Sequence, residues 1–138
     1  MKIKIKKLHT DAIIPKYAHE GDAGMDVFAI SRKEAGKFIE YGTGLAFELP
    51  LGYVMLVFAR SSVTNKDLML KNSVGVLDSG YRGELVMRFN KIGDEEYKVG
   101  DKIGQIIVLP LPTVEFEETE ELSESSRGTG GFGSTGDK

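Results

Sequence analysis

The chain has 138 residues, of which 41% are hydrophobic and 28% charged, and this length suits one domain with a sizeable core. Its formal net charge is −3, so no overall basic field favours nucleic acid as a partner. The absence of cysteine excludes disulfides and thiolate zinc sites, and leaves oxygen atoms as the main metal ligands. No stretch approaches transmembrane length and the lysine-rich start lacks a secretory apolar core, so we expect a cytoplasmic protein without a membrane segment.

The first half of the chain predicts short strands separated by glycines and loops. Ile3 and Ile5 alternate with lysine, which is typical of an edge strand with a charged outer face. Residues 9–21 contain Pro15 and are predicted to be a loop. Four further short apolar segments follow at 23–30, 37–41, 45–49 and 52–58. The last of them is almost continuously apolar, which indicates a strand that is buried on both faces.

The second half continues this pattern with few helical signals. Residues 62–67 predict one or two helical turns, and no other segment has a helical period over any length. Residues 102–109 predict another buried strand, which ends at Pro110. Many short strands with regular turn signals predict an all-β sandwich, barrel or jelly roll.

Residues 75–90 are predicted to form a hairpin around Ser79-Gly80, because glycine readily takes the positive φ that tight turns need. This hairpin would hold Asp78 at its neck, with Tyr81 directly across from it. A carboxylate and an aromatic ring fixed together suit a small-molecule site. The alternative is an ordinary turn in which aspartate is only the usual turn residue.

The last residues differ in kind from the rest of the chain. Residues 117–126 are acidic and serine-rich, so they predict a solvated linker that buries little apolar area. Residues 127–136 carry Arg127 and Phe132 among glycines. One interpretation is a frayed tail. The other is a lid, in which the arginine pairs with phosphate, glycine amides approach it, and the phenyl ring stacks on a flat base.

Three other polar positions invite a functional interpretation. Asp26 lies within an apolar segment and needs a partner or a metal-bound water. Arg60 and Ser61 stand where the most buried strand ends, which suits an anion, although Ser61 could equally be a simple helix N-cap. Gln105 lies within an apolar strand, where its amide must find either structural or ligand partners.

Taken together, five stretches resemble the five ordered motifs of the trimeric deoxyuridine triphosphatases (dUTPases). The stretches are residues 22–26, 59–62, 75–83, 103–106 and 127–136. The resemblance covers almost the whole chain, and the third and fifth motifs are the most specific. It implies a distorted jelly-roll (a dUTPase-like β-clip) with at most one short helix and a flexible C-terminal arm. Residues 1–116 would form the β domain, residues 117–126 the linker and residues 127–138 the lid.

The resemblance also implies an activity, the hydrolysis of dUTP to dUMP and pyrophosphate with Mg²⁺. This reaction limits uracil in DNA and supplies dUMP for thymidylate synthesis. The family assembles as homotrimers with active sites shared between subunits. The acidic linker would then let the lid of one subunit reach the site of a neighbour.

Roles of single residues carry over from the motifs that they match. Asp78 matches the base that orients the attacking water, and Tyr81 the ring that packs on deoxyribose and leaves no space for a 2′-hydroxyl. Asn72 matches a position that helps to read uracil. The phosphate side of the site holds Ser61 and Gln105, with Arg60 and Ser62 as further substrate-binding residues. Asp26 matches a residue that reaches the metal through water. The lid residues are Arg127, Gly130, Gly131 and Phe132.

The sequence departs from the family pattern at two positions. Gly80 stands where the family often has a second acidic residue, and Ser62 stands where a glycine is usual. Arg-Ser-Ser at 60–62 is typical of the related dCTP deaminases, but Arg88 occupies the position of their catalytic glutamate and cannot act as its acid–base. Deamination is therefore the weaker alternative. A non-catalytic or moonlighting nucleotide-sensing regulatory protein on the same fold is the other.

Overall fold

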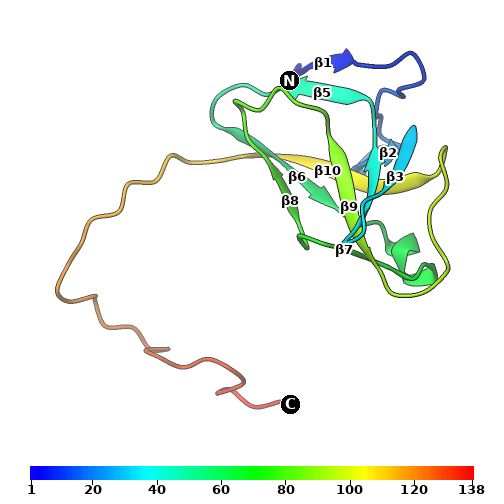
Figure 1. Ribbon diagram of the computed structural model, residues 1–138. Coiled ribbons are helices and arrows are strands. Elements are labelled where there is room, and N and C mark those ends of the chain that lie inside the picture. The colour runs from blue at the N-terminus through cyan, green and yellow to red at the C-terminus, as the bar shows by residue number, and fades with distance from the viewer.

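The computed structural model describes residues 1–138 and is built almost entirely of β-strands (Figure 1). The predicted all-β fold with at most one short helix is confirmed. The single helix is the 3₁₀ helix η1 (Ser61–Asn65), close to the predicted helical turns. The strands are β1 (Lys4–Lys7), β2 (Met25–Phe28), β3 (Ser31–Glu34), β4 (Ile39–Gly42), β5 (Leu45–Glu48), β6 (Tyr53–Phe58), β7 (Leu68–Leu70), β8 (Gly75–Leu77), β9 (Val86–Lys91) and β10 (Lys102–Pro110).

The strands form three antiparallel sheets around one core. One sheet has the order β2-β10-β6-β8, another has the order β3-β4-β9-β7, and β1 pairs with β5 alone. The apolar faces of both four-stranded sheets contribute to one buried cluster. At its centre the rings of Tyr41, Phe89 and Tyr97 meet edge to face, with centroids 5.7 to 6.2 Å apart. The Tyr41 hydroxyl donates a hydrogen bond to the Tyr97 carbonyl at 2.8 Å, so its buried polar atom is satisfied.

The predicted hairpin at 75–90 was wrong in its pairing. β8 pairs with β6 in one sheet, whereas β9 pairs with β4 and β7 in the other. The turn itself is present, because the Tyr81 amide donates to the Asp78 carbonyl at 3.1 Å. Gly80 does not take a positive φ, and Tyr81 stands on the same turn as Asp78, not across a ladder from it. Leu77 and Leu85 are both buried, and their packing in the core draws the two strands apart.

Two strands had no clear signal in the sequence. β3 reads Ser-Arg-Lys-Glu and β7 reads Leu-Met-Leu, and neither alternates apolar and polar residues over a useful length. Both lie at the edges of their sheet, where one neighbour supplies all the pairing. β1 is likewise an edge strand with mostly exposed lysines, as predicted.

Residues 111–138 contain no strand and extend away from the β body after β10 (Figure 1). The Leu111 amide donates to the Gly52 carbonyl at 2.7 Å, close to the point where the chain leaves the sheet. The side chains beyond it are almost all exposed. No helix in the structure has the length and apolar character needed to cross a bilayer.

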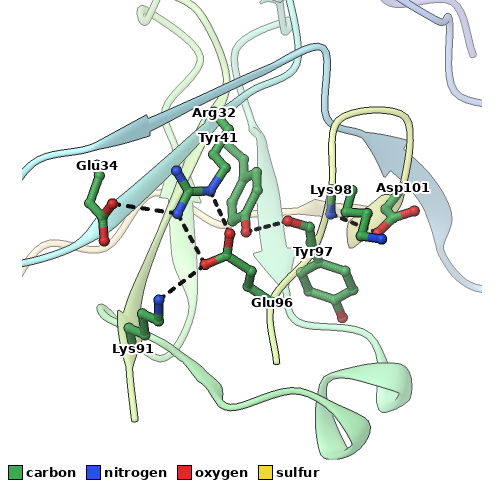
Figure 2. A network of polar contacts seen from close by, with 8 residues as sticks. All are labelled: Arg32, Glu34, Tyr41, Lys91, Glu96, Tyr97, Lys98 and Asp101. Atoms are coloured by element: carbon green, nitrogen blue, oxygen red, sulfur yellow. Dashed lines mark hydrogen bonds and ion pairs between the residues drawn. The ribbon is translucent and has the colours of Figure 1, made fainter. Parts of the chain in front are cut away.

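A polar network ties β3 to the loop that precedes β10 (Figure 2). The Arg32 guanidinium contacts the Glu96 carboxylate at 2.8 Å and 3.0 Å, and Lys91 approaches the same carboxylate at 3.5 Å. The hydrogen bond from Arg32 and the two positive charges hold the pKa of Glu96 below its ordinary value of 4.5. Burial raises the pKa of the neighbouring Tyr41.

The lowered pKa of Glu96 predicts how stability depends on pH. Its ionised form is favoured by folding, so its contribution is present above its ordinary pKa and is lost as the pH falls through the lower, folded value. We expect Glu96→Gln to reduce the free energy of unfolding at pH 7 by about 1 kcal/mol. The difference from wild type should shrink below about pH 4.5. Urea unfolding at pH 7 and pH 3 measures it, with Glu117→Gln on the exposed segment as the control. A difference that stays constant with pH would contradict the assignment.

Candidate active site

A cavity of about 460 Å³ opens where β8 and β9 diverge into separate sheets. Three predicted site residues line it together, although they lie on different segments: Asn72 after β7, and Asp78 and Tyr81 on the turn after β8. Val76 of β8 is largely exposed and contributes an apolar wall. A concave site with apolar walls and a few polar groups is the usual form of a small-molecule pocket.

The turn at 78–81 is fixed from outside by Arg82. Its guanidinium donates to the Ser79 carbonyl at 2.7 Å and to the Tyr81 carbonyl at 3.2 Å. The same group stands 3.7 Å from Glu48 of β5, which also forms an ion pair with Lys4 of β1 at 3.1 Å. The hydrogen bond from Lys4 lowers the pKa of Glu48. Arg82 therefore connects the turn to the outer two-stranded sheet, a role that the sequence did not indicate.

Arg88 also lines the cavity, at its β9 side. Its Nε lies 2.8 Å from the Glu40 carboxylate, and the guanidinium carbon stands 4.4 Å from the centre of the Phe38 ring. The position that would hold an acid–base glutamate in a deaminase is thus occupied by a cation that is paired and stacked.

A second group of predicted residues gathers around Arg60 and β2. The Nε of Arg60 donates to the Asp26 carboxylate at 2.7 Å, and Lys102 approaches the other carboxylate oxygen at 3.2 Å. Asp26 therefore has the partner that its place in an apolar strand requires. The Gln105 amide donates to the Ala59 carbonyl at 3.1 Å, which is the structural alternative left open by the sequence.

Ser62 occupies a structural position in this group. Its hydroxyl accepts a hydrogen bond from Arg60 at 3.2 Å and lies 3.1 Å from the buried Tyr97 hydroxyl. Ser61 is exposed at the start of η1, and its carbonyl accepts the Thr64 hydroxyl at 2.8 Å. The N-cap of η1 is Arg60, so the N-cap interpretation of Ser61 was wrong. The Ser61 hydroxyl is the one in this group that faces solvent without a structural bond.

The glycine arm lies apart from both groups in the single chain (Figure 1). Its residues form successive turns, in which the Gly130 amide donates to the Arg127 carbonyl at 3.0 Å and the Ser134 amide to the Gly131 carbonyl at 3.1 Å. The Arg127 side chain folds back onto the Gly130 carbonyl at 2.9 Å. Phe132 takes a φ of 52° and its ring is fully exposed.

Comparison with known proteins decides the family. The family model described as dUTPase matches residues 10–136. The chain belongs to the dUTPase family of enzymes. The resemblance inferred from the five motifs is therefore confirmed over nearly the full chain.

Relatives and solved structures agree with this assignment. The deoxyuridine 5′-triphosphate nucleotidohydrolase of Clostridium acetobutylicum is 45% identical, and the match covers 97% of this chain and 96% of that protein. The Helicobacter pylori (strain P12) protein of the same name is 41% identical, with 99% and 97% covered. The Staphylococcus bacteriophage 80alpha dUTPase, solved with dUPNHPP, superposes with a TM-score of 0.82 at 30% identity and covers 98% of both chains. Its description states that phage dUTPases control transfer of virulence genes.

The contact between Ser62 and Tyr97 generates a prediction about stability. We expect Ser62→Ala and Tyr97→Phe each to lower the free energy of unfolding by about 1 kcal/mol, because each leaves a hydroxyl without its partner. The double variant should lose less than the sum, with a coupling of roughly 0.5–1 kcal/mol. Urea titrations of the four proteins measure this cycle, and Thr119→Ala on the exposed segment is the control. Additive losses would show that the two hydroxyls do not interact.

Proposed function

We propose that this chain hydrolyses dUTP to dUMP and pyrophosphate in the cavity between β8 and β9. The observation that carries the proposal is the meeting of Asn72, Asp78 and Tyr81 at this cavity, in a chain that belongs to the dUTPase family. Asn72 supplies an amide to contact the nucleobase, Asp78 a carboxylate to bind a water molecule, and Tyr81 an aromatic ring to pack on the sugar. A cytoplasmic location and the supply of dUMP remain predictions from the sequence and the resemblance.

Asp78 is the proposed base of the reaction. Its side chain makes no hydrogen bond or ion pair within the chain, so its carboxylate oxygens are free to accept from a water molecule. That water would attack the α-phosphorus of dUTP. A positioned base contributes on the order of a hundred- to ten-thousand-fold. Phosphoryl transfer otherwise depends mainly on positioning and charge neutralisation, which the remaining residues would supply.

Tyr81, Asn72 and the backbone of the turn are the proposed selectors of nucleoside. Tyr81 would pack on the deoxyribose and leave no room for a 2′-hydroxyl. Uracil presents a donor at N3 and an acceptor at O4, and cytosine reverses both. A site whose buried groups pair with one base leaves them unpaired with the other, which is costly. The positions of Tyr81 and Asn72 on the cavity wall support this assignment.

The phosphate side of the site is proposed to use Ser61 and the cationic group around it. Ser61 has a free hydroxyl at the start of η1, whereas Ser62 and Gln105 are already engaged in structural contacts. We therefore assign Ser61 the direct contact, and Arg60 and Ser62 the shaping of that edge of the site. Gln105 would contribute by holding the Ala59 carbonyl.

The residues present fit a magnesium ion that is held mostly by substrate and water. No cluster of three or more His, Cys, Asp or Glu side chains comes together, so the chain offers no all-protein cage. Mg²⁺ commonly keeps several waters and takes substrate phosphates as ligands. Both Asp26 oxygens already face cations, which suits a contact through water rather than a direct one. When bound, the ion would neutralise phosphate charge.

A homotrimer with shared sites is proposed as the active assembly. Pro110 and Arg127 are separated by a segment that can extend over roughly 55–60 Å. Residues 127–136 lie toward the end of this exposed segment, away from the β body (Figure 1). In a neighbouring subunit, Arg127 would pair with the terminal phosphate and Phe132 would cover the uracil, with Gly130 and Gly131 allowing close approach.

Arg88 weighs against the deaminase alternative. Its guanidinium is paired with Glu40 and stacked on Phe38, so position 88 supplies a fixed cation and not an acid–base carboxyl group. A regulatory role could accompany hydrolysis, as the description of the phage relative states for phage dUTPases. The products formed from each nucleotide separate these possibilities.

Product analysis tests the proposal. Purified protein with Mg²⁺ is incubated separately with dUTP, dCTP, dTTP and UTP, and the products are resolved by chromatography. We expect dUMP and pyrophosphate from dUTP alone. Asp78→Asn should lower kcat by on the order of 10²- to 10⁴-fold and keep binding of a non-hydrolysable dUTP analogue. Asp94→Asn, in the loop after β9, should leave both unchanged. Turnover of dCTP, or full activity of Asp78→Asn, would contradict the proposal.

Removal of residues 127–138 tests the arm. We expect kcat/KM for dUTP to fall on the order of a hundredfold, because the phosphate and base partners at the end of the arm are lost. The melting temperature should stay unchanged, since these residues form no strand and bury almost nothing. Removal of residues 137–138 alone is the control. An unchanged rate after the longer truncation would refute the lid.

A further inference from the structure

The ring of Tyr81 lies on the backbone of Gly83, two residues along the chain. A Cβ atom built on Gly83 would overlap the Tyr81 Oη and would stand 2.5 Å from Cζ and 2.9 Å from Cε2. Real Cβ atoms essentially never come within 3.0 Å of such atoms, so no side chain fits at position 83 while the ring keeps its place. Tyr81 is about half exposed and lines the cavity.

The hydroxyl end of the same ring is fixed as well. It donates a hydrogen bond to the Glu84 carbonyl at 2.9 Å. The Glu84 carboxylate in turn accepts the Gly44 amide at 2.7 Å, in the turn between β4 and β5. The next residue, Leu85, is tied to the same turn, because its amide donates to the Leu45 carbonyl at 2.8 Å. The ring therefore rests on a segment that is anchored to another part of the fold.

We propose that Gly83 and Glu84 are positioning residues that set the place of the Tyr81 ring and thereby the discrimination between deoxyribose and ribose. The inference rests on the proposed function of Tyr81 at the sugar. Gly83 acts by the absence of a side chain beneath the ring. Glu84 acts through its carbonyl on the hydroxyl and through its carboxylate on Gly44.

Substitution of Gly83 by alanine would change the contact with the Tyr81 ring without straining the backbone. The φ of Gly83 lies outside the left-handed region, so alanine strains no backbone there. The atoms in the way belong to the far end of the half-exposed Tyr81 side chain, so the ring can move at the cost of its one hydrogen bond to the Glu84 carbonyl. The ring must shift by about 1 Å to reach an ordinary contact distance. A displacement of this size at a reacting site costs up to about a hundredfold in rate.

Asp94, in the loop after β9, supplies a control outside the site. Its side chain is exposed and makes no hydrogen bond or ion pair within the chain, so Asp94→Asn leaves the Tyr81 ring undisturbed. For Glu84, the isosteric Glu84→Gln keeps an oxygen acceptor for the Gly44 amide, whereas Glu84→Ala removes it.

The experiment compares kcat/KM for dUTP and for UTP in wild type and the variants Gly83→Ala, Asp94→Asn, Glu84→Ala and Glu84→Gln. We expect the ratio of the two values to fall at least about tenfold in Gly83→Ala, with most of the loss in KM for dUTP. Glu84→Ala should also lower the ratio, and Glu84→Gln should restore most of it. Asp94→Asn should match wild type. An unchanged ratio in Gly83→Ala, or an equal fall in Asp94→Asn, would overturn the proposal.

A crystal structure of the unliganded Gly83→Ala protein gives a readout that does not depend on activity. We expect the Tyr81 ring to be displaced and its hydrogen bond to the Glu84 carbonyl to be lost. A ring that stays in place would overturn the positioning role even if turnover changed. A wild-type protein that leaves dUTP intact would instead refute the proposed function, while the ring position would still decide whether Gly83 seats Tyr81.

Discussion

The structure depends on the divergence of β8 and β9 into different sheets. Leu77 is buried at the end of β8. Leu85, just before β9, and Met87, near the start of β9, are buried as well. Burying these side chains in one core requires the connecting segment to cross from sheet to sheet. A paired hairpin would close the space between the strands. The separated strands leave a cavity of about 460 Å³, and the crossing segment carries Asp78 and Tyr81 along its wall.

A wall built from a loop is useful only if the loop holds its shape, and polar contacts supply this. Arg82 binds the carbonyls of the turn, and Glu84 binds the Gly44 amide. Hydrogen bonds that involve a charged group are roughly twice as strong as neutral ones. The crossing segment is therefore pre-organised before any ligand arrives, which spares a bound nucleotide the entropy of ordering it.

The candidate site residues are divided between the body and the C-terminal segment. The body holds a free carboxylate and a ring at the cavity, and a paired cationic group around Arg60. The segment holds Arg127 and a fully exposed Phe132. An exposed aromatic ring on a glycine arm contributes favourable free energy only when another group covers it, and a flat nucleobase would provide that contact by stacking. The single chain does not bring these parts together, which is why an assembly with shared sites is proposed.

The amino-acid sequence was enough to predict the all-β class, the position of the one short helix, the edge character of β1 and the residue types from which a site could be built. These features have local signatures in periodicity, turn residues and motifs. Three other features depend on the complete fold: the pairing of β8 with β6, the strands β3 and β7, and the contact of Tyr81 with Gly83 and Glu84. The contact between Glu84 and Gly44 joins residues 40 positions apart, and such contacts are fixed by packing of the whole core. Strand pairings and long-range contacts that depend on packing of the whole core have no signature in a short stretch of sequence.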